Sequence, residues 1–348
     1  MTHRPAAGQL RSGAIAPAQP ARSPAVDVSP APDNQHVPGR FQILSLDGGG
    51  YKGMFSAAVL AKLEQDLGLT VADHFDLVAG TSTGGIIALA MGAGLAAADV
   101  VEFYARHGHH IFNRRRLRGP RQLLRAKYSA RPLQAALEDV FGERALGESR
   151  VRLIIPSYDL RSDKTYLFRT DHASHLERDW RERMVDVALA TSAAPTFLPA
   201  HRLRGLRLVD GGVWANNPAA VALVEAVAFL GADVGGIRVF SLGTTSEVRH
   251  RPRRLDWGGL LPWARHSTDV ILRAQALSAS NFVRNLVGEA NWLRLDPRVP
   301  DKVLRLDGVS IDELLGRAED ESREIQPAFK RLFVEHNGTR HTSTHHTT

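Results

Sequence analysis

One short segment carries the residue types that could perform acyl transfer. Gly80-Thr81-Ser82-Thr83-Gly84 has the Gly-x-Ser-x-Gly pattern of a nucleophile elbow, in which a serine sits on a strained turn from a strand into a helix. Small neighbours leave the serine hydroxyl open to a substrate, and the start of a helix favours the negative charge that develops during attack. The sequence therefore predicts Ser82 as a nucleophile, with Gly80 and Gly84 as the glycines of the motif.

A glycine-rich segment lies upstream of that serine. Asp47-Gly48-Gly49-Gly50-Tyr51-Lys52-Gly53 ends an apolar run and opens a helical pattern, so its N–H groups can bind an anion. We expect the backbone of Gly48, Gly49 and Gly50 to form an oxyanion hole, with Gly53 as a motif glycine. The same letters spell Gly-x-Gly-x-x-Gly, the dinucleotide fingerprint. The candidate ribose acids are Asp66 and Asp73. However, Asp66 lies inside a helical pattern and the second strand ends at the serine elbow, which argues against nicotinamide or flavin binding.

A serine nucleophile needs a base, and Asp210 is the strongest candidate. It follows the apolar run 206–209 and precedes Gly211-Gly212, so it projects from the end of a strand without bulky neighbours. A carboxylate within reach of Ser82 could take its proton directly, although Asp-Gly-Gly by itself is equally typical of a turn. Many hydrolases instead use a histidine held by an acid. The candidate histidines downstream of the serine are His107, His109, His110, His172, His175, His201, His250 and His266.

The elements that must position these residues alternate along the chain. Strand-like runs lie at 41–46, 75–79, 151–157, 165–169, 206–209 and 237–242. Helical patterns lie near 53–67, 83–94, 97–106, 131–140, 180–192, 218–230, 263–287 and 311–335. This alternation predicts an α/β fold with a largely parallel sheet covered by helices on both faces. A basic stretch at 106–131 interrupts the pattern, and we expect a flap beside the site there.

Taken together, these blocks resemble the patatin-like phospholipase family. Asp-Gly-Gly-Gly-x-Lys-Gly, Gly-Thr-Ser-Thr-Gly and Asp-Gly-Gly occur in the family's order. The stretches 190–197 and 241–244 are similar to two further family segments, so the resemblance covers roughly 41–245. It implies a three-layer patatin-like fold and a Ser82–Asp210 dyad that cleaves acyl esters of phospholipids without a metal. Lys52 stands where plant members usually have arginine, so a role of that position is not carried over.

The sequence of these core segments is most similar to one bacterial branch of the family, the patatin-like effectors of cyclic-oligonucleotide antiphage systems. That resemblance implies an antiviral phospholipase that a cyclic dinucleotide switches on, with no other cofactor. Arg114, Arg115, Arg116 and Arg118 are the candidate contacts for the activator's phosphates. The alternatives are a constitutive soluble serine esterase or lipase and, less favoured, a nucleic-acid-binding protein.

Charge and composition set the remaining expectations. The formal net charge is +7, yet nine Lys/Arg lie in 106–131 and four more in 249–254, so the basic character is local. This suggests an anionic surface or ligand, although solvated helix faces and loops explain such charge runs equally well. The few aromatic residues nearby argue against DNA or RNA. Trp257 and Trp263 flank an apolar stretch that suits a lipid headgroup contact, although packing of this stretch on the core is the somewhat favoured explanation. Zero cysteines are compatible with a reducing compartment.

We expect four regions along the chain. They are a disordered Pro/Ala-rich leader at 1–38, a catalytic core at 39–245, a helical extension packed on it at 246–335, and a frayed polar tail at 336–348. No apolar stretch approaches the ~20 residues of a membrane span. We therefore expect a cytoplasmic enzyme that binds peripherally to the inner membrane when active. The position of the cleaved ester, the headgroup preference and the formation of a homo-oligomer stay open.

Overall fold

The computed structural model describes residues 39–111, 126–248, 252–259, 263, 266–300 and 311–345. The predicted leader, most of the basic stretch and the four candidate activator arginines, Arg114, Arg115, Arg116 and Arg118, lie outside these ranges. Among the described helices, none is both long and apolar enough to cross a bilayer.

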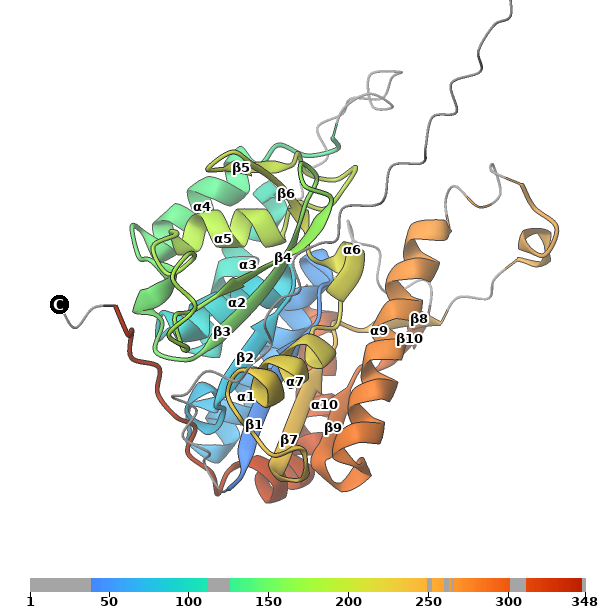
Figure 1. Cartoon of the computed structure of the whole chain (residues 1–348). Coiled ribbons are helices and arrows are strands. Elements are labelled where there is room, and N and C mark those ends of the chain that lie inside the picture. The colour runs from blue at the N-terminus through green and yellow to red at the C-terminus, as the bar shows by residue number, and fades with distance from the viewer. Residues whose placement is uncertain are drawn as a thin grey trace, which may run out of the picture.

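An eight-stranded mixed sheet forms the centre of the molecule (Figure 1). Its strands are β1 (Phe41–Leu46), β2 (Leu77–Gly80), β3 (Leu153–Asp159), β4 (Lys164–Arg169), β5 (His201–Leu203), β6 (Leu206–Asp210), β7 (Ile237–Leu242) and β9 (Trp292–Leu295). Their order is β5-β6-β3-β2-β1-β7-β9. Strand β4 lies outside this order and pairs with the edge of β3 that β2 and β6 leave free. The strands from β3 to β9 along this path are parallel, whereas β4, β5 and β6 pair antiparallel to their neighbours. A separate parallel pair joins β8 (Ser246–Val248) and β10 (Arg298–Pro300).

Helices cover both faces of the sheet, which gives three layers (Figure 1). The helices are α1 (Gly53–Leu67), α2 (Thr83–Gly92), α3 (Ala97–Ile111), α4 (Arg131–Phe141), α5 (Met184–Thr191), α6 (Gly212–Ala215), α7 (Ala219–Ala228), α9 (Ser267–Val287) and α10 (Ile311–Phe333). Successive residues of β1 point to opposite faces. Leu44 therefore joins the core under α1, α2, α3 and α10, whereas Ile43 joins the core under α7 and α9.

The predicted α/β class with a mostly parallel sheet is confirmed, and two details differ from expectation. The extension at 246–335 does more than pack on the core, because it supplies β9 to the central sheet next to β7. The antiparallel β5 was not expected; it pairs with β6 through residues 201–203. Its three residues are too few to show a periodic pattern in the sequence.

The predicted frayed tail is wrong for residues 336–345, which lie against the core. The buried Asp76 carboxylate accepts hydrogen bonds from His336 Nε2 at 2.7 Å and from the Thr339 amide at 2.8 Å. His341 is buried, and its Nε2 lies 3.1 Å from Oδ1 of the fully buried Asp171. Buried carboxylates need donors, and this polar segment provides them.

Candidate active site

Ser82 occupies a strained elbow between β2 and α2. Its φ of 55° and ψ of −120° are a backbone conformation that residues other than glycine rarely adopt. The elbow can form because a Cβ on Gly80 would collide with the carbonyl of Gly84, and one on Gly84 would collide with that of Leu46. The Ser82 amide donates to Thr191 Oγ1 at 3.0 Å, which fixes the turn and leaves the hydroxyl to do chemistry.

The sheet topology brings Asp210 to the serine. β3 pairs with β4 along one edge and shares its other edge between two strands. Residues 153–154 pair with β2, and residues 157–159 pair with β6, which runs in the opposite direction. The C-terminal ends of β2 and β6 therefore meet beside β3. Ser82 follows one end and Asp210 closes the other, 128 residues apart in the chain.

The two side chains form a short hydrogen bond. Ser82 Oγ donates to Asp210 Oδ2 at 2.6 Å, and the other carboxylate oxygen accepts the Gly212 amide at 2.7 Å. Burial raises the pKa of Asp210 from 3.8 to about 6, against these two hydrogen bonds, which lower it. A pKa near 6 leaves the carboxylate ionised at neutral pH and basic enough to accept a proton. The arrangement can therefore deprotonate the serine during attack on a carbonyl.

The glycine-rich segment lies beside the serine, but its three glycines are not equivalent. A Cβ on Gly48 would lie 3.3 Å from Ser82 Cβ, which places this residue against the elbow. The Gly48 amide donates to the Asn216 carbonyl at 3.0 Å, so it is already bonded within the protein, and its part in the oxyanion hole stays a prediction. Within the described chain the amides of Gly49 and Gly50 have no such acceptor. Gly50 has φ +60°, and both remain candidates for the hole.

The remaining motif glycines allow close packing around the elbow. A Cβ on Gly53 would collide with Thr83, and one on Gly211 would collide with the Pro156 carbonyl. A Cβ on Gly212 would lie 3.0 Å from Asp210 Oδ1. These residues shape the site through their small size.

An arginine far from the motifs binds Asp47, the first residue of the glycine-rich segment, and sequence reasoning missed this arginine. Arg294 of β9 reaches across β7 and makes two bonds to the Asp47 carboxylate, at 2.9 and 2.6 Å. The same guanidinium donates to Ser241 Oγ at 2.6 Å and lies 3.3 Å from Asp296. Burial opposes its charge, but the carboxylates of Asp47 and Asp296 outweigh burial and raise the pKa of Arg294. A basic residue inside an otherwise apolar strand was the available signal.

The histidine alternative finds no support in the described residues. His172 binds Thr170 and Glu225, and His201 binds Asp186, so neither contacts the serine. The hydroxyl of Ser82 has Asp210 as its partner. Across the described ranges, no group of three or more His, Asp or Glu side chains is placed to hold a metal.

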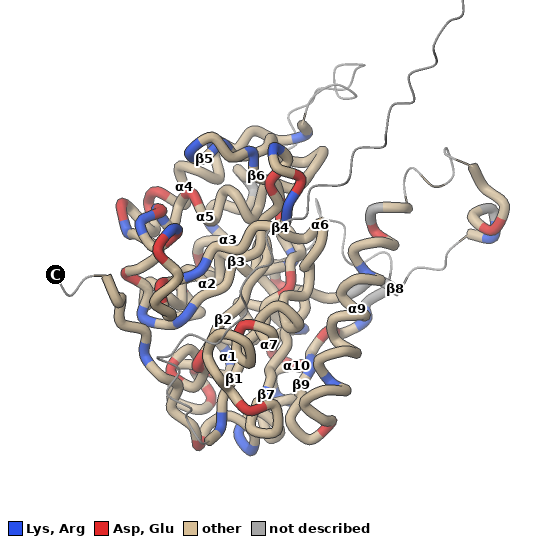
Figure 2. Tube along the Cα trace, in the orientation of Figure 1, with Lys and Arg blue, Asp and Glu red and all other residues tan. Residues whose placement is uncertain are grey.

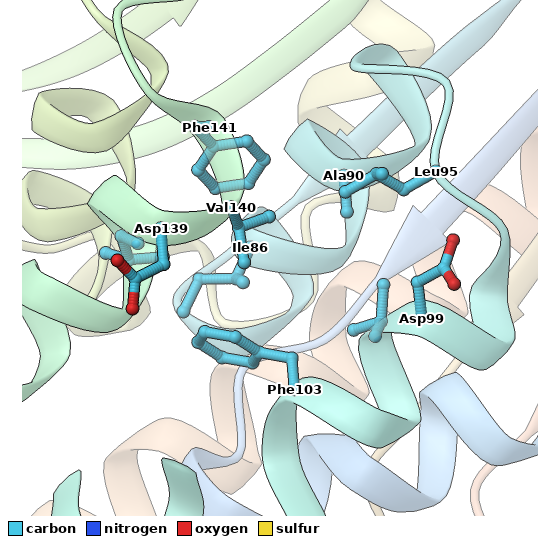
Figure 3. A pocket seen from close by; sticks show the side chains of 10 residues that line it. Ile86, Ala90, Leu95, Asp99, Phe103, Asp139, Val140 and Phe141 are labelled. Atoms are coloured by element: carbon cyan, nitrogen blue, oxygen red, sulfur yellow. The ribbon is translucent and has the colours of Figure 1, made fainter. Parts of the chain in front are cut away.

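A pocket of about 230 Å³ opens beside the helix that begins at the serine (Figure 3). It lies between α2, α3 and α4, and the rings of Phe103 and Phe141 face Ile86 from two sides. Ile86 is one turn beyond the serine, and its amide donates to the Ser82 carbonyl. Ser82 and Asp210 do not line this pocket, so it is a neighbour of the pair and not part of it.

A strained serine, a buried carboxylate partner and open glycine amides define a serine acyl hydrolase on a three-layer α/β fold. The sequence profile of the patatin-like phospholipase family matches residues 44–223. The chain belongs to this family and is a lipid acyl hydrolase.

Three relatives illustrate the similarity. A cGAMP-activated phospholipase of Pseudomonas aeruginosa is 35% identical over 283 residues, which cover 78% of this chain and 84% of the relative. A protein of the same name from Vibrio cholerae is 34% identical over 81% of this chain and 90% of its own. Patatin-like protein 1 of Oryza sativa subsp. indica is 29% identical over 78% and 77% of the two chains. These matches extend beyond the family profile.

Proposed function

We propose that the chain is a phospholipase that cleaves membrane phospholipid through an acyl-enzyme on Ser82, with Asp210 as the general base. The observation that carries the proposal is the 2.6 Å hydrogen bond between the Ser82 hydroxyl and the Asp210 carboxylate. A direct hydroxyl–carboxylate pair supplies both nucleophile and base without a third residue.

In the first half-reaction, Ser82 Oγ attacks the ester carbonyl carbon while Asp210 accepts the hydroxyl proton. The amides of Gly49 and Gly50 stabilise the resulting oxyanion. The tetrahedral intermediate collapses, the bond to the leaving alcohol breaks, and Asp210 returns its proton to that oxygen. The lysolipid departs and the acyl group stays on the serine.

In the second half-reaction, Asp210 takes a proton from a water that attacks the acyl-enzyme. The same oxyanion site stabilises the second intermediate. The bond from the acyl carbon to Ser82 Oγ then breaks, the serine regains its proton from Asp210, and the fatty acid leaves.

We further propose that a cyclic dinucleotide switches the enzyme on and that it acts in antiviral defence. Two relatives that cover most of this chain are named cGAMP-activated phospholipases, and the core motifs resemble the antiphage branch. Arg114, Arg115, Arg116 and Arg118 stay the predicted activator contacts, since arginine suits phosphate recognition. The setting that goes with this function is the cytoplasm, with the enzyme bound to the inner membrane when active.

A vesicle hydrolysis assay tests both parts. Fatty acid release from phospholipid vesicles is measured with cGAMP, with other cyclic dinucleotides and with none. We expect release that depends on one nucleotide and is abolished by Ser82→Ala and Asp210→Asn. The matched controls Ser129→Ala and Asp139→Asn alter exposed residues and keep full activity. Full activity without nucleotide would contradict activation by a cyclic dinucleotide, and activity of the Ser82→Ala variant would contradict the proposed Ser82–Asp210 dyad.

A further inference from the structure

The carbonyl of Gly48 is held by two side chains. Asn216 Nδ2 and Thr244 Oγ1 each donate to it at 3.4 Å. The Gly48 amide donates in turn to the Asn216 carbonyl at 3.0 Å, so Asn216 contacts both polar groups of this glycine. A Cβ on Gly48 would lie 2.7 Å from Asn216 Oδ1, which shows how closely the two residues pack. These contacts fix the position of the Gly48 main chain beside the nucleophile.

The orientation of this carbonyl determines the orientation of the next amide. The Gly48 carbonyl and the Gly49 N–H belong to one planar trans peptide unit, so they point in opposite directions. Within the part of the chain that the structure describes, the Gly49 amide donates to no protein acceptor. A Cβ on Gly49 would collide with Thr244 Oγ1, so glycine is what lets Thr244 approach this closely. The groups that hold the Gly48 carbonyl therefore direct a donor of the candidate oxyanion hole.

Helix α9 holds Asn216 in place. The Asn216 amide donates to Gln275 Oε1 at 2.8 Å, and α9 packs on α6 and α7 (Figure 1). Asn216 ends α6, six residues after Asp210, so this bond joins α9 to the segment that carries the general base. Gln275 lies outside the residues 44–223 that the family profile matches. The family motifs by themselves therefore do not indicate a role for it.

A second path leads from α9 to the same glycine-rich segment. Asn217 Nδ2 donates to Ser280 Oγ of α9 at 2.9 Å and to Ser241 Oγ at 3.4 Å. Ser241 Oγ also accepts a hydrogen bond from Arg294, which binds Asp47. Asn217 and Ser241 are buried, where hydrogen bonds are stronger than in water. The two paths end on consecutive residues at the start of the glycine-rich segment.

We infer that Gln275 of α9 is a positioning residue for ester hydrolysis. It fixes Asn216, which together with Thr244 directs the Gly49 amide toward the oxyanion. An amide stabilises the transition state only when it points to the place where the charge develops, so a small rotation of this peptide unit weakens catalysis. The inference rests on the proposed function in taking Ser82 as the nucleophile and the glycine amides as the oxyanion hole.

Steady-state hydrolysis of a short monomeric ester tests this role, with saturating cGAMP and without it. Gln275→Met removes the acceptor oxygen and keeps the length of the side chain. Its matched control is Leu277→Met, which places the same side chain at an exposed position of the same helix. Gln275→Glu keeps an acceptor oxygen at the same place. The charged residues that follow Asp269 in α9 are arginines, blue in Figure 2, so the new carboxylate meets no acid on its own helix.

We expect Gln275→Met to lower kcat roughly tenfold with little change in KM, because the oxyanion donor acts on the transition state and not on the bound ester. Leu277→Met should keep the parent kcat, and Gln275→Glu should regain most of the loss. The midpoint of the pH profile should stay that of the parent, since the two hydrogen bonds of the Asp210 carboxylate are intact. Damage to the general base would move this midpoint.

A trifluoromethyl ketone inhibitor reports on the oxyanion hole directly. Ser82 Oγ adds to the ketone carbon, the hydroxyl proton passes to Asp210, and the carbonyl oxygen becomes an oxyanion that the hole must bind. We expect the inhibition constant to rise in Gln275→Met by the same factor by which kcat falls. If circular dichroism shows that Gln275→Met does not fold, Thr244→Val takes its place, and Thr244→Ser is the variant that keeps the hydroxyl.

Three results would overturn the inference. They are an equal kcat in Gln275→Met and Leu277→Met, a lower kcat with an unchanged inhibition constant, and a loss that Gln275→Glu does not reduce. Ser82→Ala, measured in parallel, separates this inference from the proposed function. Hydrolysis by Ser82→Ala would contradict the proposed function itself, whereas an inactive Ser82→Ala beside an unaffected Gln275→Met would contradict only the positioning role.

Discussion

The buried state of Asp210 sets the pH dependence of hydrolysis. Its carboxylate must be ionised to accept the serine proton, and burial raises its pKa from 3.8 to about 6. The active form therefore accumulates as the pH rises through about 6, and activity is lost as the pH falls below that value. Relative to an exposed aspartate, this shift adds about 3 kcal/mol to the free energy of ionising the Asp210 carboxyl.

The expected magnitude follows directly. At about pH 5, roughly a tenth of Asp210 is ionised, so kcat/KM should be about a tenth of its plateau, with a tenfold loss for each further pH unit. A carboxylate at 3.8 would keep more than about nine-tenths of its activity at that pH. The difference is large enough to decide between the two.

The assay is hydrolysis of a short monomeric ester from about pH 4.5 to about pH 8, which avoids any change in the vesicles. Asp139→Asn, at an exposed position, should give the parent profile, and circular dichroism at each pH checks that the fold persists. A flat profile down to about pH 5 would refute the reasoning, as would a midpoint that moves when a histidine is replaced.

Three further predictions concern the supports of the site. Arg294→Met should lower kcat by roughly 10²-fold with little change in KM, because Asp47 loses the partner that fixes the glycine-rich segment. Arg294→Lys should lower kcat less, and the control Arg323→Met, at an exposed position, should leave kcat unchanged. Gly84→Ala should lower the free energy of unfolding by about 3 kcal/mol, whereas Gly316→Ala in α10, with open space around it, should raise it by roughly 0.5–1 kcal/mol in urea titrations. A chain that ends after Glu335 should melt several degrees lower by calorimetry, since the buried Asp76 and Asp171 lose the hydrogen-bond partners that the terminal segment supplies; an unchanged melting temperature would show the terminal contacts to be irrelevant.

Much of the fold could be predicted because its signals are local. The strands β1 and β7 and the helix α1 have the predicted bounds, since the strands are short, mostly apolar runs and the helix has the apolar spacing of a helix and ends before Gly68. The elbow at Ser82 and the strand-end position of Asp210 were likewise readable from a few neighbouring letters.

The parts that could not be predicted depend on contacts between distant segments. Nothing in the letters near Gly48 shows that its amide meets the Asn216 carbonyl. The partnership of Arg294 with Asp47 spans 247 residues and requires the order β1-β7-β9, which the sequence does not reveal. The tail around His341 has a polar composition typical of a solvated end, and it is ordered by the buried Asp171.

Covalent labelling of the serine tests the central claim most directly. The protein is treated with a fluorophosphonate, and the modified peptide and the rate of modification are measured by mass spectrometry. The Ser82–Asp210 pair predicts one label per chain, on Ser82, with a rate at least about 10²-fold lower in Asp210→Asn. Labelling of a different serine, or an equal rate in Asp210→Asn, would contradict the account.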